Sequence, residues 1–139
     1  MSTNQTISNN IYTKINFNTV AYDTNSNYNA STYRFTPTIA GYYKMDFNLG
    51  IVATAGRTYA FAPSIYKNGT SYSSLEFDML ISASATNVNV PYSDLIYMNG
   101  TTDYLEAYFY QYDFTATSTV NILSTNQSSK ITCFLARAA

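Results

Sequence analysis

The chain has 139 residues, with seven Lys and Arg against eight Asp and Glu, no His, no Trp and a single Cys. A net charge of -1 with 11% charged residues provides no basic field, so we expect neither nucleic-acid binding nor membrane insertion. Without a His or a second Cys, Cys133 lacks the partners for an intramolecular disulfide, a zinc site or a thiol triad, and a core position is expected for it.

Short runs of β-branched and aromatic residues, separated by Asn, Gly, Ser and Asp about every ten residues, predict an all-β protein. Residues 1–12 are interpreted as a polar N-terminal tail or stalk connection, and residues 13–139 as one domain. The predicted strands, in chain order, are 14–22, 32–36, 42–53, 57–67, 70–83, 86–98, 103–114, 118–125 and 130–138. Asn68-Gly69 predicts a hairpin with a type I′ turn, whose two central residues both need positive φ.

Alternation separates a core face from an outer face in two of these strands. In 42–53 the odd-numbered residues from Tyr43 to Ile51 are apolar, while Tyr42, Lys44, Asp46 and Asn48 alternate with them. In 103–114 Leu105, Ala107 and Phe109 form a core face and tyrosines gather on the other. Tyrosine is a good strand former whose hydroxyl water can satisfy, but a row this long favours an interface.

Residue types needed for common enzyme chemistry are missing. No His is present to act as a base, no Gly-x-Ser-x-Gly elbow occurs, and the five glycines are scattered rather than forming a phosphate-binding loop. The carboxylates alternate along strands or lie in turns, where solvated or ion-paired surface roles are usual. The sequence therefore predicts a protein that is not an enzyme and has no cofactor.

The segment from Asp23 to Asn27 has oxygen-bearing side chains at the spacing that begins a calcium-binding EF-hand loop. Tyr28 stands where that loop needs Gly, and Arg34 stands where its closing Glu belongs. An EF-hand is excluded, no residue is assigned as a metal ligand, and the segment is interpreted as a polar turn.

The order of several motifs resembles the globular C1q domain of the tumour necrosis factor-like superfamily. The motifs are "INFNTVAYD", "YNASTYRFTPTIAGYYKMDFNLGI", "SIYKNG", "NGTTDYLEAYFYQ" and "ITCFLARA", and together they cover about residues 15–138. Phe35, Gly41, Tyr42, Tyr43 and Phe47 occupy the places that match the family's central signature. The chain departs from the animal members in lacking a collagen-like stalk, their tryptophan and their cysteines, and two threonines are inserted before Asp103.

The resemblance implies a ten-stranded, two-sheet jelly-roll sandwich that assembles as a compact homotrimer. It makes Tyr104, Tyr108, Tyr110 and Phe134 candidates for the threefold interface. It also leaves open a Ca²⁺ site at a loop or at the trimer apex, as in some members of the family. Core positions are expected at Phe35, Tyr43, Phe47, Leu105, Phe109, Cys133 and Leu135.

Loops and outer faces rich in Asn, Tyr, Thr and Ser are typical of a binding module. By analogy of fold and composition, we expect a receptor-binding or adhesion domain at the tip of a viral, for example bacteriophage, fibre on the virion surface, joined to an upstream fibre or stalk and recognising a host-surface glycan or protein. Candidate ligand contacts are Tyr28, Asn29, Tyr112 and Phe114. The alternatives are a structural trimerisation cap of a bacterial or spore surface filament and a secreted, extracellular lectin-like or cytokine-like ligand.

Overall fold

The computed structural model describes residues 1–82, 87–125 and 128–139. Within these ranges twelve strands form two antiparallel sheets packed face to face as a β-sandwich. The all-β prediction is confirmed, although residues 83 and 86, at the ends of two predicted strands, lie outside the described ranges. In the described part of the chain, no helix has the length and apolar character needed to cross a membrane.

The first sheet, sheet A, is built around β5 (Gly41–Val52). On one side, β9 (Asn87–Met98) pairs with β5 along its whole length. On the other side β5 pairs with β12 (Lys130–Ala138) and, near its C-terminal end, with β11 (Val120–Ile122). Sheet A ends at β1 (Gln5–Ile7), which pairs with β11.

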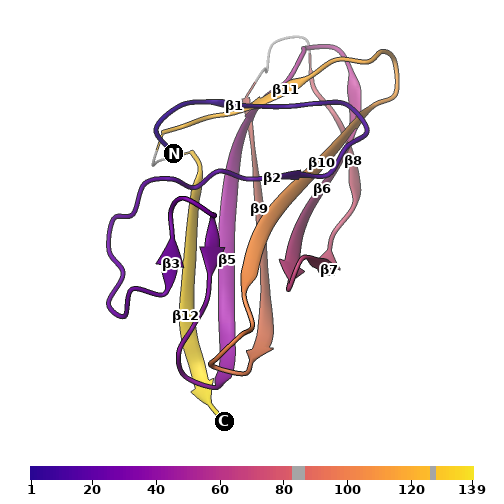
Figure 1. Ribbon diagram of the computed structural model, residues 1–139. Helices are drawn as coiled ribbons and strands as arrows, with labels where there is room; N and C mark the ends of the chain where they lie inside the picture. Colours follow the sequence, from indigo (N-terminus) through magenta and orange to yellow (C-terminus); the bar gives the residue numbers. More distant parts are fainter. Residues whose placement is uncertain (83–86, 126–127) are drawn as a thin grey trace.

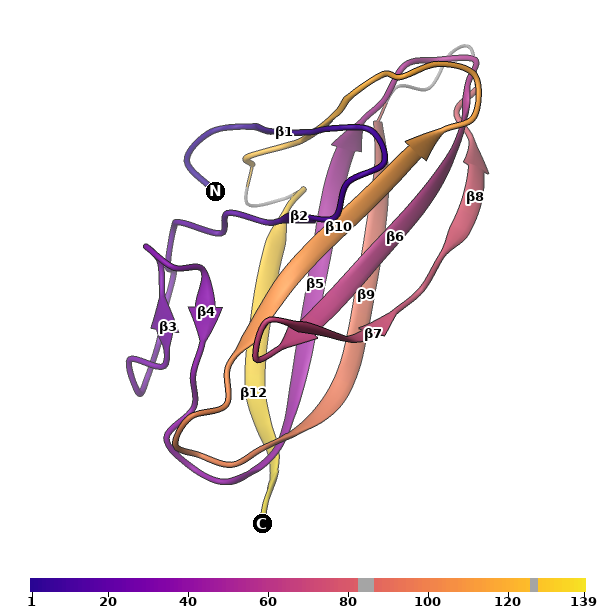
Figure 2. The ribbon, with the colours of Figure 1, turned by 45° about the vertical axis from the view of Figure 1, so that its right-hand side comes forward.

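The second sheet, sheet B, is built around β10 (Leu105–Asp113) and β6 (Thr58–Lys67), which pair over nine residues. Shorter strands extend it on both sides. They are β2 (Thr13–Lys14), β3 (Tyr28–Asn29), β4 (Arg34–Phe35), β7 (Thr70–Ser74) and β8 (Phe77–Leu80). The long strands run side by side from one end of the molecule to the other, and β1 and β2 lie across them near the upper end (Figures 1 and 2). The C-terminus lies at the lower end.

The core lies between the two sheets and follows the predicted alternation. The inward residues of β5, from Tyr43 to Ile51, are at most 3% exposed, and Phe109 of β10 is fully buried. Phe35 of sheet B meets Tyr43 of sheet A edge to face, with ring centroids 5.5 Å apart. Five of the seven expected core residues are buried: Phe35, Tyr43, Phe47, Leu105 and Phe109.

The other two expected core residues lie on β12. Cys133 is half-buried and packs against the core, whereas Leu135 is 37% exposed, so its core assignment is wrong for the single chain. The pairing of β12 with β5 becomes irregular between Leu135 and Arg137, near the C-terminal end of β12, which is an edge strand of sheet A. Leu135 therefore lines a surface groove instead of the closed interior.

The N-terminal segment corrects another prediction. Residues 5–7, expected in a polar tail, form β1 in sheet A, and Ile7 is completely buried. Of the predicted strand 14–22 only Lys14 lies in a strand, the two-residue β2, and the described part of 70–83 divides into β7 and β8 around Leu75 and Glu76. The N-terminal residues are thus part of the sandwich.

The first Asn-Gly turn has the predicted geometry. Asn68 and Gly69 both have positive φ, 54° and 79°, and they join Lys67 to its partner Thr70. The type I′ prediction is therefore confirmed. The second Asn-Gly dipeptide is different, because the Asn99 side chain accepts hydrogen bonds from the backbone of Thr101 and of the two residues after it.

Gly100 is expected to be the less replaceable of two glycines with almost the same φ. Gly100 and Gly56 have φ of 72° and 75°, but a Cβ at Gly100 would collide with the backbone of Ile39 and Ala40, whereas a Cβ at Gly56 meets nothing within 4 Å. Gly56→Ala should cost about 1 kcal/mol through its φ alone, and Gly100→Ala about 3 kcal/mol. Urea unfolding of both variants checks this, and equal losses would contradict the close backbone approach.

Candidate binding surfaces

The outer face of sheet B carries a row of aromatic rings along β10. The residues of β6 opposite these rings are small, with Tyr108 facing Ser64 and Tyr110 facing Ala62. Small partners leave room for tyrosine rings to lie across the neighbouring strand. We call this row, with the rings that stack on it, the aromatic band: Tyr12, Tyr66, Tyr104, Tyr108, Tyr110, Tyr112 and Phe114.

The centre of the aromatic band is a connected stack of four rings. Tyr66 stacks on Tyr108 with ring centroids 3.9 Å apart, and Tyr12 stacks on Tyr110 at 4.9 Å. Tyr12 and Tyr66 join the two pairs at 6.3 Å. Burial raises the pKa of Tyr66, Tyr108 and Tyr110, so these hydroxyls stay protonated at neutral pH and can donate or accept hydrogen bonds.

Each end of the aromatic band is fixed by a different contact. At one end the Arg34 guanidinium lies over the Tyr104 ring, 4.0 Å from its centroid. At the other end Tyr112 and Phe114 meet edge to face at 5.2 Å. Exposure rises toward this second end, from half-buried Tyr104 to Phe114, which is 53% exposed. The band is thus ordered by its own contacts while leaving ring surface open to solvent.

A buried carboxylate lies within the tyrosine row. Glu106 is 2% exposed and forms ion pairs with Lys14 Nζ at 3.0 Å and with Arg34 Nε at 2.9 Å. The hydrogen bond to Glu106 raises the pKa of Arg34. Through this carboxylate, β10 holds both β2 and β4.

The outer face of sheet A carries a second, separate apolar cluster. Tyr42 and Tyr97 are cross-strand partners whose rings meet edge to face at 5.5 Å. Lys44 lies between Leu95 on β9 and Phe134 on β12, since it is the register partner of both. We call the following residues, which are 42–50% exposed, the sheet A patch: Tyr42, Leu95, Tyr97 and Phe134.

The four residues expected at one threefold interface are not brought together. Tyr104, Tyr108 and Tyr110 lie on the outer side of sheet B, whereas Phe134 lies on the outer side of sheet A. The two outer sides of a sandwich face opposite directions. A single flat contact therefore cannot contain all four residues.

A groove of about 730 Å³ opens along the edge of the sandwich beside β12. Its walls include Phe17, Ile39 and Tyr43, together with the inward residues of β12 and the segment 19–25. Several of its apolar residues are well exposed, among them Tyr22 at 78% and Val20 at 45%. The groove is lined by residues of both sheets, among them Phe35 of sheet B and Tyr43 of sheet A.

Two of the four expected ligand contacts have local structural roles. The Tyr28 hydroxyl donates a hydrogen bond to the backbone carbonyl of Phe17. The Asn29 side chain accepts hydrogen bonds from the backbone of Ser31 and Thr32, which fixes the turn between β3 and β4. Tyr112 and Phe114, by contrast, are exposed and belong to the aromatic band.

Asp23, in the segment with calcium-loop spacing, caps a turn. Its carboxylate accepts hydrogen bonds from the backbone N–H groups of Asn27 at 3.1 Å and Tyr28 at 2.8 Å. Burial raises the pKa of Asp23, but these backbone hydrogen bonds outweigh it, and the pKa lies below its usual range. The oxygens are committed to the local backbone, as in a polar turn.

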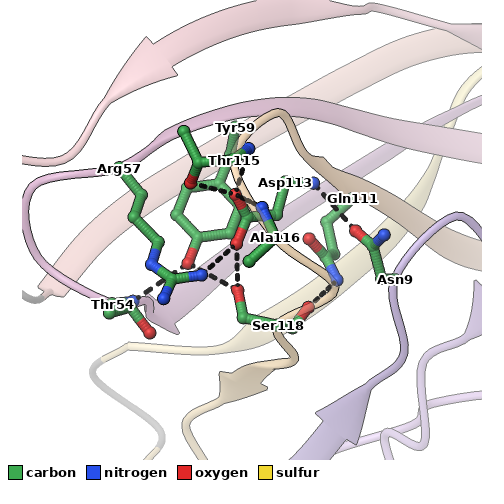
Figure 3. A network of polar contacts seen from close by, with 9 residues as sticks. All are labelled: Asn9, Thr54, Arg57, Tyr59, Gln111, Asp113, Thr115, Ala116 and Ser118. Atoms are coloured by element: carbon green, nitrogen blue, oxygen red, sulfur yellow. Dashed lines mark hydrogen bonds and ion pairs between the residues drawn. The ribbon is translucent and has the colours of Figure 1, made fainter.

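A buried polar network lies where β10 ends (Figure 3). Asp113 is 2% exposed and accepts hydrogen bonds from Arg57 Nη1 at 2.8 Å, from Ser118 and from the backbone and hydroxyl of Thr115. Its own N–H donates to Asn9 Oδ1 at 2.8 Å. The network joins the loop after β10, the start of β6 and the N-terminal segment.

The three buried carboxylates have structural ion pairs. Glu106, Asp103 and Asp113 each pair with a cation, with Asp103 Oδ2 lying 2.9 Å from Lys67 Nζ. Across the described ranges, no group of three or more His, Cys, Asp or Glu side chains could hold a metal ion. What the surfaces offer chemically is stacking, hydrogen bonding and apolar contact.

Sequence reasoning missed Tyr12 and Tyr66 of the aromatic band. Tyr12 falls in the segment interpreted as a tail, where no pairing with β10 was expected. For Tyr66 a signal was present, because Ala60, Ala62 and Ser64 alternate with large residues in the predicted strand 57–67. A strand face of small residues ending in a tyrosine indicates that large side chains from a neighbour cover it.

Comparison with protein-family models and with curated proteins found no match to the chain.

Proposed function

We propose that the protein is a homotrimeric, non-enzymatic receptor-binding domain at the tip of a virion fibre, which recognises a glycan or protein on the host surface. The observation that carries the proposal is the presence of two separate aromatic surfaces on opposite sides of one small sandwich. One surface is available for contact between copies, and the other remains free for a target. Large exposed patches of this kind usually mark interaction sites.

The strand order supports the jelly-roll part of the proposal. The chain passes from β5 in sheet A to β6 in sheet B, returns with β9, crosses again with β10 and ends in sheet A with β11 and β12. Repeated crossing between two antiparallel sheets occurs in jelly rolls, as it does in other Greek-key sandwiches. The motif order that resembles the C1q domain is the second ground for the proposed jelly roll.

Two features support a closed ring of copies, of which the proposed trimer is one case. The sheet A patch is an exposed apolar surface that meets the groove beside β12 at Phe134, and the groove is a hollow lined by exposed apolar residues such as Val20, Tyr22 and Ile39. Contact between two different surfaces of identical chains is heterologous, and it forms a ring when the rotation closes. Seating the patch of one copy against the groove edge of the next would cover both.

Binding by the intact trimer is the expected result. Fluorescently labelled protein should bind at least one member of a panel of whole bacterial cells or at least one glycan on an array. The oligomeric mass of the labelled protein should remain that of the trimer. Three linked sites raise avidity about a hundredfold or more over one site, so a dissociated variant should bind far more weakly. A structural trimerisation cap predicts a stable trimer that binds none of the cells and glycans, and that result would overturn the proposal.

A further inference from the structure

The aromatic band is prearranged as a contact surface. Ring pairs hold Tyr12, Tyr66, Tyr108 and Tyr110 against one another, and the Tyr110 hydroxyl donates to Asn10 Oδ1 at 2.9 Å. The backbone below is the longest pairing in sheet B, β10 with β6. Rings fixed in this way lose little conformational entropy when a ligand binds.

The band combines apolar ring faces with hydrogen-bonding groups. Six of its seven members are tyrosines, whose rings are apolar and whose hydroxyls donate and accept. Alternate residues of a strand lie about 6.6 Å apart, so Tyr108, Tyr110 and Tyr112 place successive rings along a line. A linear ligand with repeated apolar faces and hydroxyl groups matches this arrangement.

The charges around the band provide no positive field. Lys14 and Arg34 are the cations at its side, and both are paired with Glu106. Glu76 is close enough to Tyr110 to contribute, after burial, to the raised pKa of that tyrosine. These two cations and two carboxylates balance, and Asp78, which lies opposite Ala60 on the strand beside Tyr112, adds a negative charge. The absence of a positive field disfavours phosphate-bearing or strongly acidic ligands and suits a neutral one.

The band also lies on the side of the molecule away from the sheet A patch. An assembly that covers the sheet A patch and the groove beside β12 therefore leaves β10 and β6 facing solvent. Three such bands would be presented around one trimer. Three weakly binding bands that engage a target together would then bind it more tightly than one band alone.

We infer that the aromatic band is the ligand-binding face of the protein and that its ligand is a neutral oligosaccharide, whose sugar rings stack on the tyrosines while its hydroxyls bond to their phenol groups and to nearby amides. This inference rests on the proposed receptor-binding function and names its site and ligand class. Tyr112 and Phe114 keep their expected role as contacts, and Tyr12 joins them.

The test uses exposed rings whose removal leaves the core intact. Tyr12→Ser and Tyr112→Ser are made in the full chain, because these side chains are 40% and 37% exposed. Tyr72→Ser is the matched control, since Tyr72 is 50% exposed on β7 outside the band. Binding is measured on an array of neutral, sialylated and sulfated oligosaccharides, with the oligomeric mass and thermal unfolding recorded for each variant.

The expected result is binding of the parent to one or more neutral oligosaccharides, weakened about tenfold or more by each band variant and unchanged in Tyr72→Ser. Binding confined to sialylated or sulfated oligosaccharides would overturn the inference. So would neutral-glycan or whole-cell binding that both band variants retain, although the receptor-binding function would then stand. Absence of binding to the array and to whole cells would overturn both.

Discussion

Replacing Asp113 by Asn is expected to lower the free energy of unfolding by about 3 kcal/mol at neutral pH, because it removes the charge that pairs with Arg57 within a nearly buried network. The amide also presents a donor where Ser118 and the Thr115 backbone N–H now donate. The buried groups left without an acceptor add to the loss. Urea unfolding at one fixed protein concentration measures the change.

The same substitution should make stability less dependent on pH in acid. Burial raises the pKa of Asp113, but hydrogen bonds from Ser118, Thr115 and Arg57 outweigh it and hold the pKa well below its usual range. Stabilisation by a lowered carboxyl pKa is complete above the unfolded value of about 3.9 and is lost as the pH falls through the folded value. The stability difference between the parent and Asp113→Asn should therefore shrink between pH 5 and pH 3.

The matched control is Asp78→Asn, at an exposed aspartate on β8. A surface carboxylate contributes little to stability, so this change is expected to cost less than about 0.5 kcal/mol at any pH in that range. If the two variants lost equal stability, or if the effect of Asp113→Asn were the same at pH 5 and pH 3, the network would not be the stabilising feature described above.

In two of the long strands, the alternation of residues was sufficient to predict which side chains face the core. In β5 and β10 one face meets the core along most of the strand, so period-two alternation identified Tyr43, Phe47 and Phe109 correctly. The Asn68-Gly69 turn was equally readable, since few residues other than Asn and Gly adopt its two positive φ values at low cost.

Pairing between distant segments was not readable from the sequence. The partner of β1 is β11, and Gln5 lies opposite Ile122, so nothing within a local window marks residues 5–7 as a strand. Alternation also assigns a residue to a face without saying which sheet its strand joins. The family resemblance grouped Phe134 with tyrosines that lie across the sandwich, and alternation could not separate them. The stacking of Tyr12 and Tyr66 on the tyrosines of β10 was missed as well.

Replacing Leu95 by Glu is expected to dissociate the assembly. The parent should sediment at about three times the chain mass of 15.5 kDa, and the variant at the mass of one chain. Leu95 is half exposed in the sheet A patch, where contact with a neighbouring copy would bury it. A carboxylate forced into that contact without a partner is costly, and a threefold ring repeats the cost at every interface.

Leu80→Glu is the matched control, because Leu80 is 68% exposed on β8 of sheet B and lies outside the sheet A patch. It introduces the same charge on a comparable surface strand, so its trimer should persist. A monomeric parent at micromolar concentration would contradict the trimer itself. A trimer that survives Leu95→Glu but dissociates with Leu80→Glu would place the contact between copies on sheet B instead.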